Sequence, residues 1–207
     1  MGERFPRMRK RARRALRNIS KFMTKRRSIP TAELFVRQCL DPGPLDSISG
    51  ASPSLGGNRL DVTVRYLAIE CCFGQNSYGL DLYWKLQEGR RKVQPVPDAV
   101  ERFRKLIESV QENGYDPSSE IELDSNYHLI NGAHRLALAL YYGVKELPCA
   151  VRPYRELHLY DVNWFAGRGF TGQEINLILR KSDELLAKAL CIGEEIDFSA
   201  LPSHGKP

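Results

Sequence analysis

The residues best suited to chemistry lie together in the segment Asn131-Gly132-Ala133-His134-Arg135. Alternating residues before it predict a strand, and apolar spacing after it predicts a helix that begins at Gly132. A helix N-terminus presents unpaired backbone N–H groups and a partial positive charge, so it attracts anions. Gly132 allows a ligand to approach the backbone, Arg135 can donate two parallel hydrogen bonds, and His134 can donate a hydrogen bond or transfer a proton. The segment is therefore predicted to bind phosphate groups, and we favour those of a nucleotide.

The same five residues also allow a structural interpretation, in which Arg135 pairs with a nearby acidic side chain. Glu120, Glu122 and Asp124 are the carboxylates nearest to the turn, and on an alternating strand they share one face. That face is either solvated or part of a site. His134 and Glu120 are the candidate catalytic residues, and no metal ligand is assigned. Two further arginines could add phosphate contacts, namely Arg90 and Arg91.

Several helices and strands are expected to position the turn. Helical spacing predicts helices over residues 31–39, 78–88, 97–114, 132–142 and 171–190, the last with Thr171 as a cap. Residues 60–73 are apolar enough to be buried, and their periodicity fits a helix or a strand; we favour a helix. Strands are predicted over 120–124, 127–130 and 147–151. The segment 41–57 is rich in Pro, Gly and Ser and is predicted to be a loop or linker.

Residues 96–152 resemble the ParB/sulfiredoxin superfamily in the order of four segments. A helix that ends in glycine precedes a strand and its hairpin return, and a glycine turn with a His-Arg pair then opens the next helix. A Gly-x-x-x-Leu-Pro stretch leads into a last strand. The segments that carry this resemblance are Val96–Gly114, Glu120–Asp124, Leu129–Arg135 and Gly143–Val151. The resemblance implies an α+β domain with a small mixed sheet that binds ATP, ADP or CTP through residues 131–135.

The branches of this superfamily differ at the turn. Sulfiredoxins carry a reactive cysteine directly before the His-Arg pair, whereas this chain has Ala133, so it is not expected to be a sulfiredoxin. The ADP-dependent serine kinases begin the turn with Asp, and Asn131 cannot replace that residue as a general base. Partition-type ParB proteins continue into a helix-turn-helix domain, and no such pattern is found in residues 155–207.

The resemblance favours a nucleotide-dependent phosphotransferase that acts, with Mg²⁺, on a small hydroxylated acceptor such as a sugar. The resemblance implies that a kinase of this family has a carboxylate upstream of the long helix, and Asp81, Glu88 and Asp98 give no clear match to that residue. The first alternative is a non-enzymatic, nucleotide-gated module of the ParB type that binds DNA or a protein. The second is a structural interaction module whose turn holds no ligand.

Positive charge is concentrated at the N-terminus. Residues 1–27 contain twelve Lys or Arg and one acid, so this segment carries +11 in a chain of net charge +6, and the remainder carries −5. Apolar residues recur in it at intervals of three and four and predict a basic amphipathic helix, namely Phe5, Met8, Ala12, Ala15, Leu16, Ile19, Phe22 and Met23. Such a helix can lie on an anionic membrane surface. It can also track the phosphates of nucleic acid, which we consider the weaker prediction, or dock on its own domain.

Composition indicates one domain with appendages. No apolar stretch is long enough for a membrane span, and five cysteines without C-x-x-C spacing argue against a disulfide framework and a zinc site. We therefore expect a cytoplasmic protein, peripheral on the inner face of the membrane. Four segments are predicted: a basic tail (1–27), a helical elaboration with a loop (28–95), the nucleotide-binding core (96–152) and a C-terminal helical extension (153–207).

Overall fold

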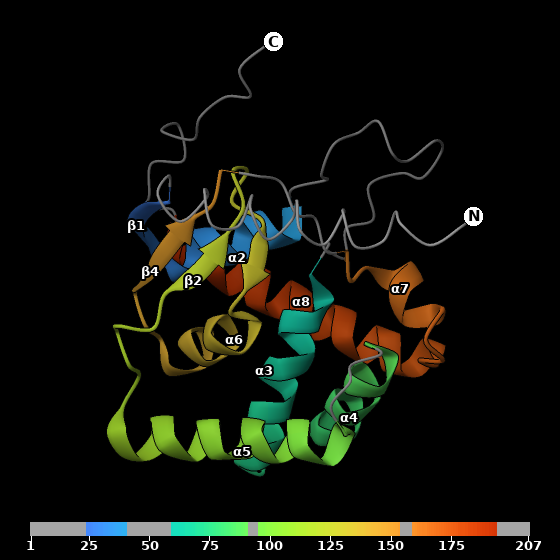
Figure 1. The fold of residues 1–207 in the computed structure, drawn as a ribbon. Helices are drawn as coiled ribbons and strands as arrows, with labels where there is room; N and C mark the ends of the chain where they lie inside the picture. The colour runs from blue at the N-terminus through green and yellow to red at the C-terminus, as the bar shows by residue number, and fades with distance from the viewer. Residues whose placement is uncertain (1–23, 41–58, 91–94, 154–158, 194–207) are drawn as a thin grey trace, which may run out of the picture.

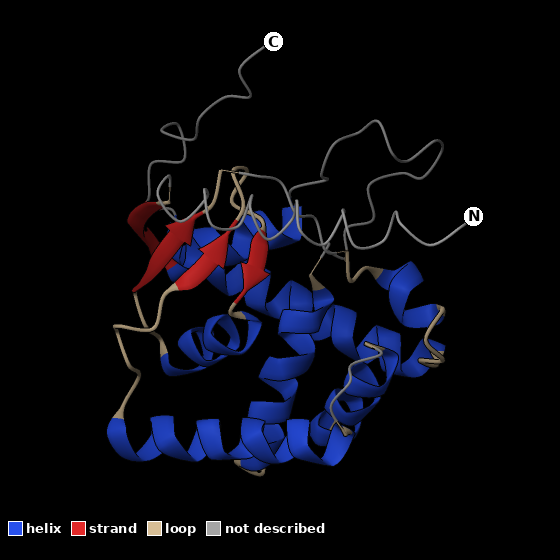
Figure 2. Ribbon diagram, viewed as in Figure 1, coloured by secondary structure: helices blue, strands red, loops and turns tan. Residues whose placement is uncertain are grey.

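The sheet of the protein has four strands and mixed pairing. A computed structural model describes residues 24–40, 59–90, 95–153 and 159–193. Its strands are β1 (Lys25–Pro30), β2 (Ile121–Leu123), β3 (Leu129–Asn131) and β4 (Glu146–Val151). They lie in the order β1-β4-β2-β3, with β4 antiparallel to β1 and parallel to β2, and β2 antiparallel to β3 (Figure 2). The described fold is therefore of the α+β class.

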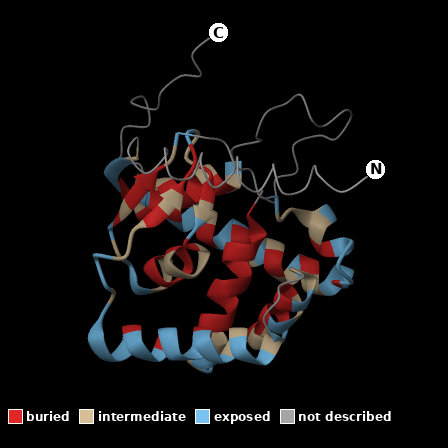
Figure 3. Ribbon diagram, in the orientation of Figure 1, coloured by how far each residue is buried: buried red, intermediate tan, exposed pale blue. Residues whose placement is uncertain are grey.

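Helices make up most of the described chain, and α3 lies at their centre (Figure 1). They are α2 (Thr31–Leu40), α3 (Leu60–Cys72), α4 (Gly79–Gly89), α5 (Val96–Asn113), α6 (Ala133–Tyr142), α7 (Val162–Ala166) and α8 (Gly172–Gly193). α3 packs against α4, α6 and α8. Residues 60–69 of α3 are all buried, which explains why most of them are apolar without a polar stripe along the helix (Figure 3).

Close contact between α3 and α4 depends on a glycine. A Cβ atom on Gly79 would lie 2.0 Å from the carbonyl oxygen of Leu67, so no other residue fits without backbone movement. Asn76 completes the junction, because its side chain accepts from the N–H of Gly79 (2.8 Å) and donates to Leu67 O (3.0 Å). This junction sets α4 directly on the central helix and thereby fixes the position of Tyr83.

α5 runs along the lower edge of the molecule in Figure 1 and exposes most of its surface. Its buried side is formed by Phe103, Ile107 and Val110, at the helical spacing seen in the sequence. The helix packs against α4. α4 and α5 together therefore form a wall beside the start of α6.

Most predicted elements are confirmed, with shifts of one to three residues at their ends. Thr171 caps α8 as expected, accepting from the N–H of Glu174 (3.2 Å). The predicted tail helix does not reach residue 27, because Lys25–Pro30 pair with β4 as a strand. α7 was not predicted. Residues 1–23 of the tail and the predicted loop 41–57 lie outside the described residues.

None of the helices in the described ranges is both long and apolar enough to cross a membrane.

Candidate functional site

The predicted glycine turn is present between β3 and α6. Gly132 has φ +109° and precedes the first residue of the helix, and no side chain caps this helix end. A Cβ atom at Gly132 would lie 3.1 Å from Cγ1 of Ile121 in β2. Because a positive φ and a tight contact coincide here, the turn requires glycine. Asn131 is the exposed last residue of β3, and Ala133 is half-buried.

Arg135, predicted to contact phosphate, and Glu120, a candidate catalytic residue, both make contacts within the fold. Arg135 donates from Nη1 to the backbone carbonyl oxygen of Glu120, so its guanidinium braces the start of β2. The Glu120 carboxylate accepts from Arg26 Nε (2.6 Å), and Glu122 accepts from Arg152 (2.5 Å). Neither glutamate is among the residues that line the cavity described below.

The third predicted carboxylate, Asp124, is fully buried, whereas Glu120 and Glu122 remain partly exposed. The Asp124 carboxylate accepts from the backbone N–H of Asn126 (2.8 Å) and His128 (2.9 Å) and lies 3.1 Å from His128 Nδ1. Burial alone would raise the pKa of Asp124, but these hydrogen bonds outweigh it and lower the pKa. Asp124 therefore does not lie on a solvated face with Glu120 and Glu122, and its carboxylate holds the β2–β3 turn.

His134 lies in the first turn of α6, and its ring contacts the rings of Tyr83 and Phe103. Its Nε2 is 2.7 Å from Tyr83 Oη, and its ring centroid is 4.5 Å from that of Phe103. The rings of Tyr83 and Phe103 are 4.8 Å apart. Three helices thus meet at His134, since Tyr83 belongs to α4 and Phe103 to α5.

A cavity of about 240 Å³ opens beside these rings. Its lining residues come from α4, α5 and α6 and are Tyr83, Gln87, Val96, Ala99, Arg102, Phe103, Leu106 and His134. Gln87 is buried, and its Nε2 has no hydrogen-bond partner among the described residues. The cavity therefore combines an apolar wall with a hydroxyl, an imidazole, an amide and a guanidinium group. We define it as the α4–α5–α6 cavity.

Positive charge surrounds Tyr83. Burial raises the pKa of this phenol above its usual value, and the charges of Arg65, Arg90 and Arg102 oppose that increase. Because the pKa stays raised, the phenol is protonated at neutral pH and can donate to Nε2 of a neutral His134. Tyr83 and His134 therefore form a pair that can pass a proton.

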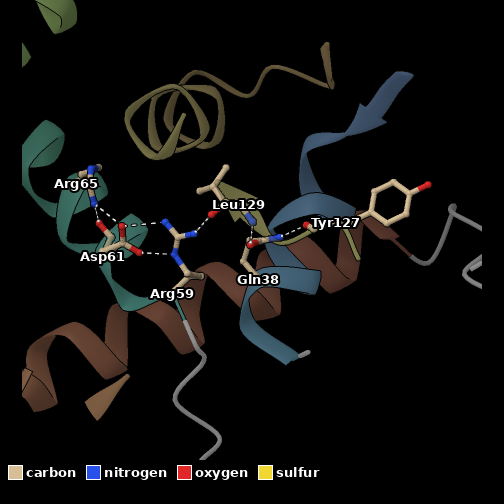
Figure 4. A network of polar contacts seen from close by, with 6 residues as sticks. All are labelled: Gln38, Arg59, Asp61, Arg65, Tyr127 and Leu129. Atoms are coloured by element: carbon tan, nitrogen blue, oxygen red, sulfur yellow. Dashed lines mark hydrogen bonds and ion pairs between the residues drawn. The ribbon is translucent and has the colours of Figure 1, made fainter. Parts of the chain in front are cut away.

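One carboxylate and two guanidinium groups are buried together at the start of α3 (Figure 4). Asp61 accepts from Arg59 Nε (2.8 Å) and from Arg65 Nη1 (2.9 Å), and all three side chains are at most 8% exposed. Burial alone would raise the pKa of Asp61, but the charges of both arginines outweigh it and lower the pKa. The Asp61 carboxylate is therefore ionised and forms ion pairs with both guanidinium groups.

This charged group is connected to the strand that leads into the turn. Arg59 donates from Nη1 to the carbonyl oxygen of Leu129 in β3 (2.5 Å). Gln38 of α2 holds the same strand, accepting from the N–H of Leu129 (2.9 Å) and donating to Tyr127 O (2.9 Å) (Figure 4). The strand entering the turn is thus fixed from two sides by buried side chains.

Arg90, predicted to add phosphate contacts, lies close enough to this charged group to act on it electrostatically. It follows α4, it contributes to the electrostatic environment of Asp61, Arg65 and Tyr83, and it lies over the ring of Tyr160 at 5.5 Å. Arg91 lies outside the described residues.

The sequence did not single out Tyr83, Gln87, Arg59, Asp61 or Arg65 as site residues. One signal was available, since Asp61 and Arg65 are charged residues within a segment otherwise apolar enough to be buried. Buried charges require partners, and this segment supplies them for each other at positions i and i+4. Tyr83 and Gln87 gave no comparable signal.

The described residues contain no group of three or more His, Cys, Asp or Glu side chains that could hold a metal ion. We compared the chain with protein-family models, with curated proteins and with solved structures, and none of the three comparisons finds a match. The resemblance of residues 96–152 to the ParB/sulfiredoxin superfamily therefore stays a prediction that rests on their motifs.

Proposed function

We propose that the protein is a nucleotide-dependent phosphotransferase whose acceptor is a small hydroxylated molecule, such as a sugar. The observation that carries this proposal is the contact of 2.7 Å between Tyr83 Oη and His134 Nε2 at the wall of the α4–α5–α6 cavity. The pair lies directly at the glycine turn that resembles a nucleotide-binding motif. A proton acceptor and a predicted phosphate-binding turn are therefore adjacent.

The pair can activate an acceptor hydroxyl without a permanent charge on Tyr83. The proton of the acceptor hydroxyl passes to Tyr83 Oη while the phenolic proton passes to His134 Nε2. The acceptor oxygen then forms a bond to the terminal phosphorus of the nucleotide, and the bond from that phosphorus to the bridging oxygen breaks. Charge on the phosphate is stabilised by the uncapped N-terminus of α6 and by the arginines around Tyr83.

The size of the cavity supports a small acceptor. Pockets for drug-sized ligands usually measure about 300–1,000 Å³. At about 240 Å³, this cavity is below that range and too small for a whole nucleotide. In the proposed arrangement the acceptor occupies the cavity, and only the terminal phosphate of the nucleotide reaches it from the α6 N-terminus.

The residues lining the cavity do not fit a magnesium site. Mg²⁺ is usually held by one or two carboxylates together with substrate phosphates, and no Asp or Glu lines this cavity in the described part of the chain. The upstream carboxylates do not replace them, because Asp81, Glu88 and Asp98 are exposed and Glu88 accepts from Trp84 Nε1. We therefore assign no step to the metal.

The lack of a carboxylate in the cavity lining favours a second candidate function. A nucleotide-gated binding module of the ParB type needs phosphate contacts but no group that activates an acceptor. In such a protein, nucleotide occupancy changes the affinity for DNA or for another protein. This candidate predicts nucleotide binding without transfer of phosphate.

Thermal unfolding of the full chain with ATP, ADP, CTP or GTP and Mg²⁺ tests nucleotide binding. A ligand at 100 times its Kd adds about 2.7 kcal/mol to the free energy of unfolding, which is visible as a higher melting temperature. Transfer is then measured by incubating the stabilising nucleotide, labelled in its terminal phosphate, with a panel of sugars. The Tyr83→Phe variant should keep nucleotide binding and lose about 100- to 10,000-fold in transfer rate, and His134→Gln should lose transfer to at least the same extent.

Ser109→Ala, a change on the exposed side of α5, is the control that should change neither quantity. If no nucleotide stabilises the folded chain, both candidate functions are excluded. Stabilisation without transfer to any acceptor would leave the nucleotide-gated module as the better assignment.

A further inference from the structure

Two buried donors near the cavity have no acceptor in the described structure. They are Nε of Arg65 and Nε2 of Gln87, and both side chains are at most 5% exposed. A buried donor without a partner costs about 1–3 kcal/mol, so two of them close to one cavity call for an explanation. An acceptor group on a ligand supplies one.

The charges around Tyr83 define what this acceptor group is. Arg59 and Arg65 pair with the single carboxylate of Asp61, and Arg90 acts on the same group electrostatically, so three positive charges are set against one negative charge. Arg90 makes no ion pair with a carboxylate among the described residues, since its recorded contact is with the Tyr160 ring. Excess positive charge and unpaired N–H donors together select an anion that accepts hydrogen bonds.

One face of α4 connects these groups to the cavity. Tyr83, Gln87 and Arg90 stand four and three residues apart, so they form a row along the helix. Tyr83 and Gln87 line the cavity, and Arg90 comes at the end of the row. Arg65 of α3 lies beneath the row, where it interacts electrostatically with Tyr83 and Arg90.

We propose that Gln87 and Arg90 of this row, with Arg65 beneath it, bind an oxyanion on the acceptor itself, so that the ligand of the cavity is a small molecule carrying its own carboxylate or phosphate. The inference rests on the proposed function in taking the cavity as the acceptor site. It narrows the acceptor from hydroxylated molecules in general to anionic ones, such as a sugar phosphate or a sugar acid.

The anion site is tested first without nucleotide, by titrating the full chain with inorganic phosphate at constant ionic strength. Phosphate should raise the melting temperature, and Arg90→Gln and Gln87→Leu should each weaken its binding about tenfold or more. Arg104→Gln is the matched control, because Arg104 is an exposed arginine of α5 that does not line the cavity. Gln87→Leu should fold normally, because it replaces an unpaired buried amide with an apolar group.

Glucose, glucuronate and glucose 6-phosphate then compare acceptors that differ at one carbon atom. We expect the protein to bind glucuronate or glucose 6-phosphate but not glucose. The anionic sugar that binds more tightly then shows whether the site prefers a carboxylate or a phosphate. Equal binding of glucose, no binding of inorganic phosphate, or phosphate binding unchanged in both variants would each overturn the inference. These titrations contain no nucleotide, so anion binding can be observed even if the protein transfers no phosphate. Failure of this inference can therefore be distinguished from failure of the proposed phosphotransferase function.

Discussion

Asp61 pairs with two guanidinium groups that would otherwise be buried without any negative partner. Removing one partner of a buried ion pair costs about 3–5 kcal/mol, whereas exposed pairs contribute about 1 kcal/mol or less. Asp61→Asn keeps the shape of the side chain and removes its charge. We expect it to lower the free energy of unfolding by about 3–5 kcal/mol, measured by urea denaturation. Glu101→Gln, which breaks the exposed pair with Lys105, should change it by less than about 0.5 kcal/mol.

The lowered pKa of Asp61 adds a pH dependence to the same comparison. A carboxylate whose pKa is lower in the folded state stabilises that state above its unfolded pKa of about 3.9 and loses this contribution as the pH falls through the folded value. Stability should therefore fall below about pH 4 in the native chain, and less steeply in Asp61→Asn. Equal slopes in both proteins would mean that Asp61 is not held ionised by Arg59 and Arg65.

At the scale of elements, the turn at Gly132 joins the sheet to the helix that carries His134. Gly132→Ala should destabilise the fold by about 1–3 kcal/mol, because alanine must adopt φ +109° and its Cβ would press on Ile121. The control is Gly143→Ala at the other end of α6, where φ is +67° and no atom lies within 4 Å of the new Cβ. There we expect only the cost of a left-handed alanine, about 1–2 kcal/mol.

Circular dichroism during thermal unfolding measures both glycine variants. If Gly132→Ala were no more destabilising than Gly143→Ala, the contact with Ile121 would not constrain the turn. The same pair of variants separates folding from ligand binding, since only Gly132 belongs to the predicted phosphate-binding segment.

The elements that the sequence predicted well are those with local signals. α5, α6 and α8 have regular apolar spacing and stop or cap residues, which require no knowledge of distant partners. β1 was missed because Lys25–Pro30 has no alternating pattern and is a strand only through pairing with β4, more than a hundred residues away.

The residues of the candidate site also differ in whether a local sequence signal marks them. His134 was predicted from the turn beside it, whereas Tyr83 and Gln87 acquire a role only where α4 meets α5 and α6.

For the molecule as a whole, the position of β1 determines how the basic tail can be studied. Removing residues 1–27 would delete half of β1, which pairs with β4 along its whole length. Removing residues 1–23 leaves the strand intact and still takes away nine Lys or Arg and one acid. We therefore expect the chain without residues 1–23 to unfold at the same temperature as the full chain, whereas removal of residues 1–30 should lower that temperature markedly.

The 1–23 deletion also tests the prediction that the basic tail binds an anionic membrane surface. Each Lys or Arg near an anionic bilayer contributes about 1 kcal/mol, and salt screens this attraction over a distance of about 8 Å at physiological ionic strength. The full chain should sediment with vesicles containing phosphatidylserine and be released by high salt, and it should not sediment with vesicles of phosphatidylcholine alone. The truncated chain should stay in the supernatant in every case while keeping its nucleotide-induced stabilisation. The contrary outcome is strong, salt-sensitive binding of the full chain to DNA without sedimentation on anionic vesicles. It would mean that the basic tail binds nucleic acid and not a membrane, and it would favour the nucleotide-gated module.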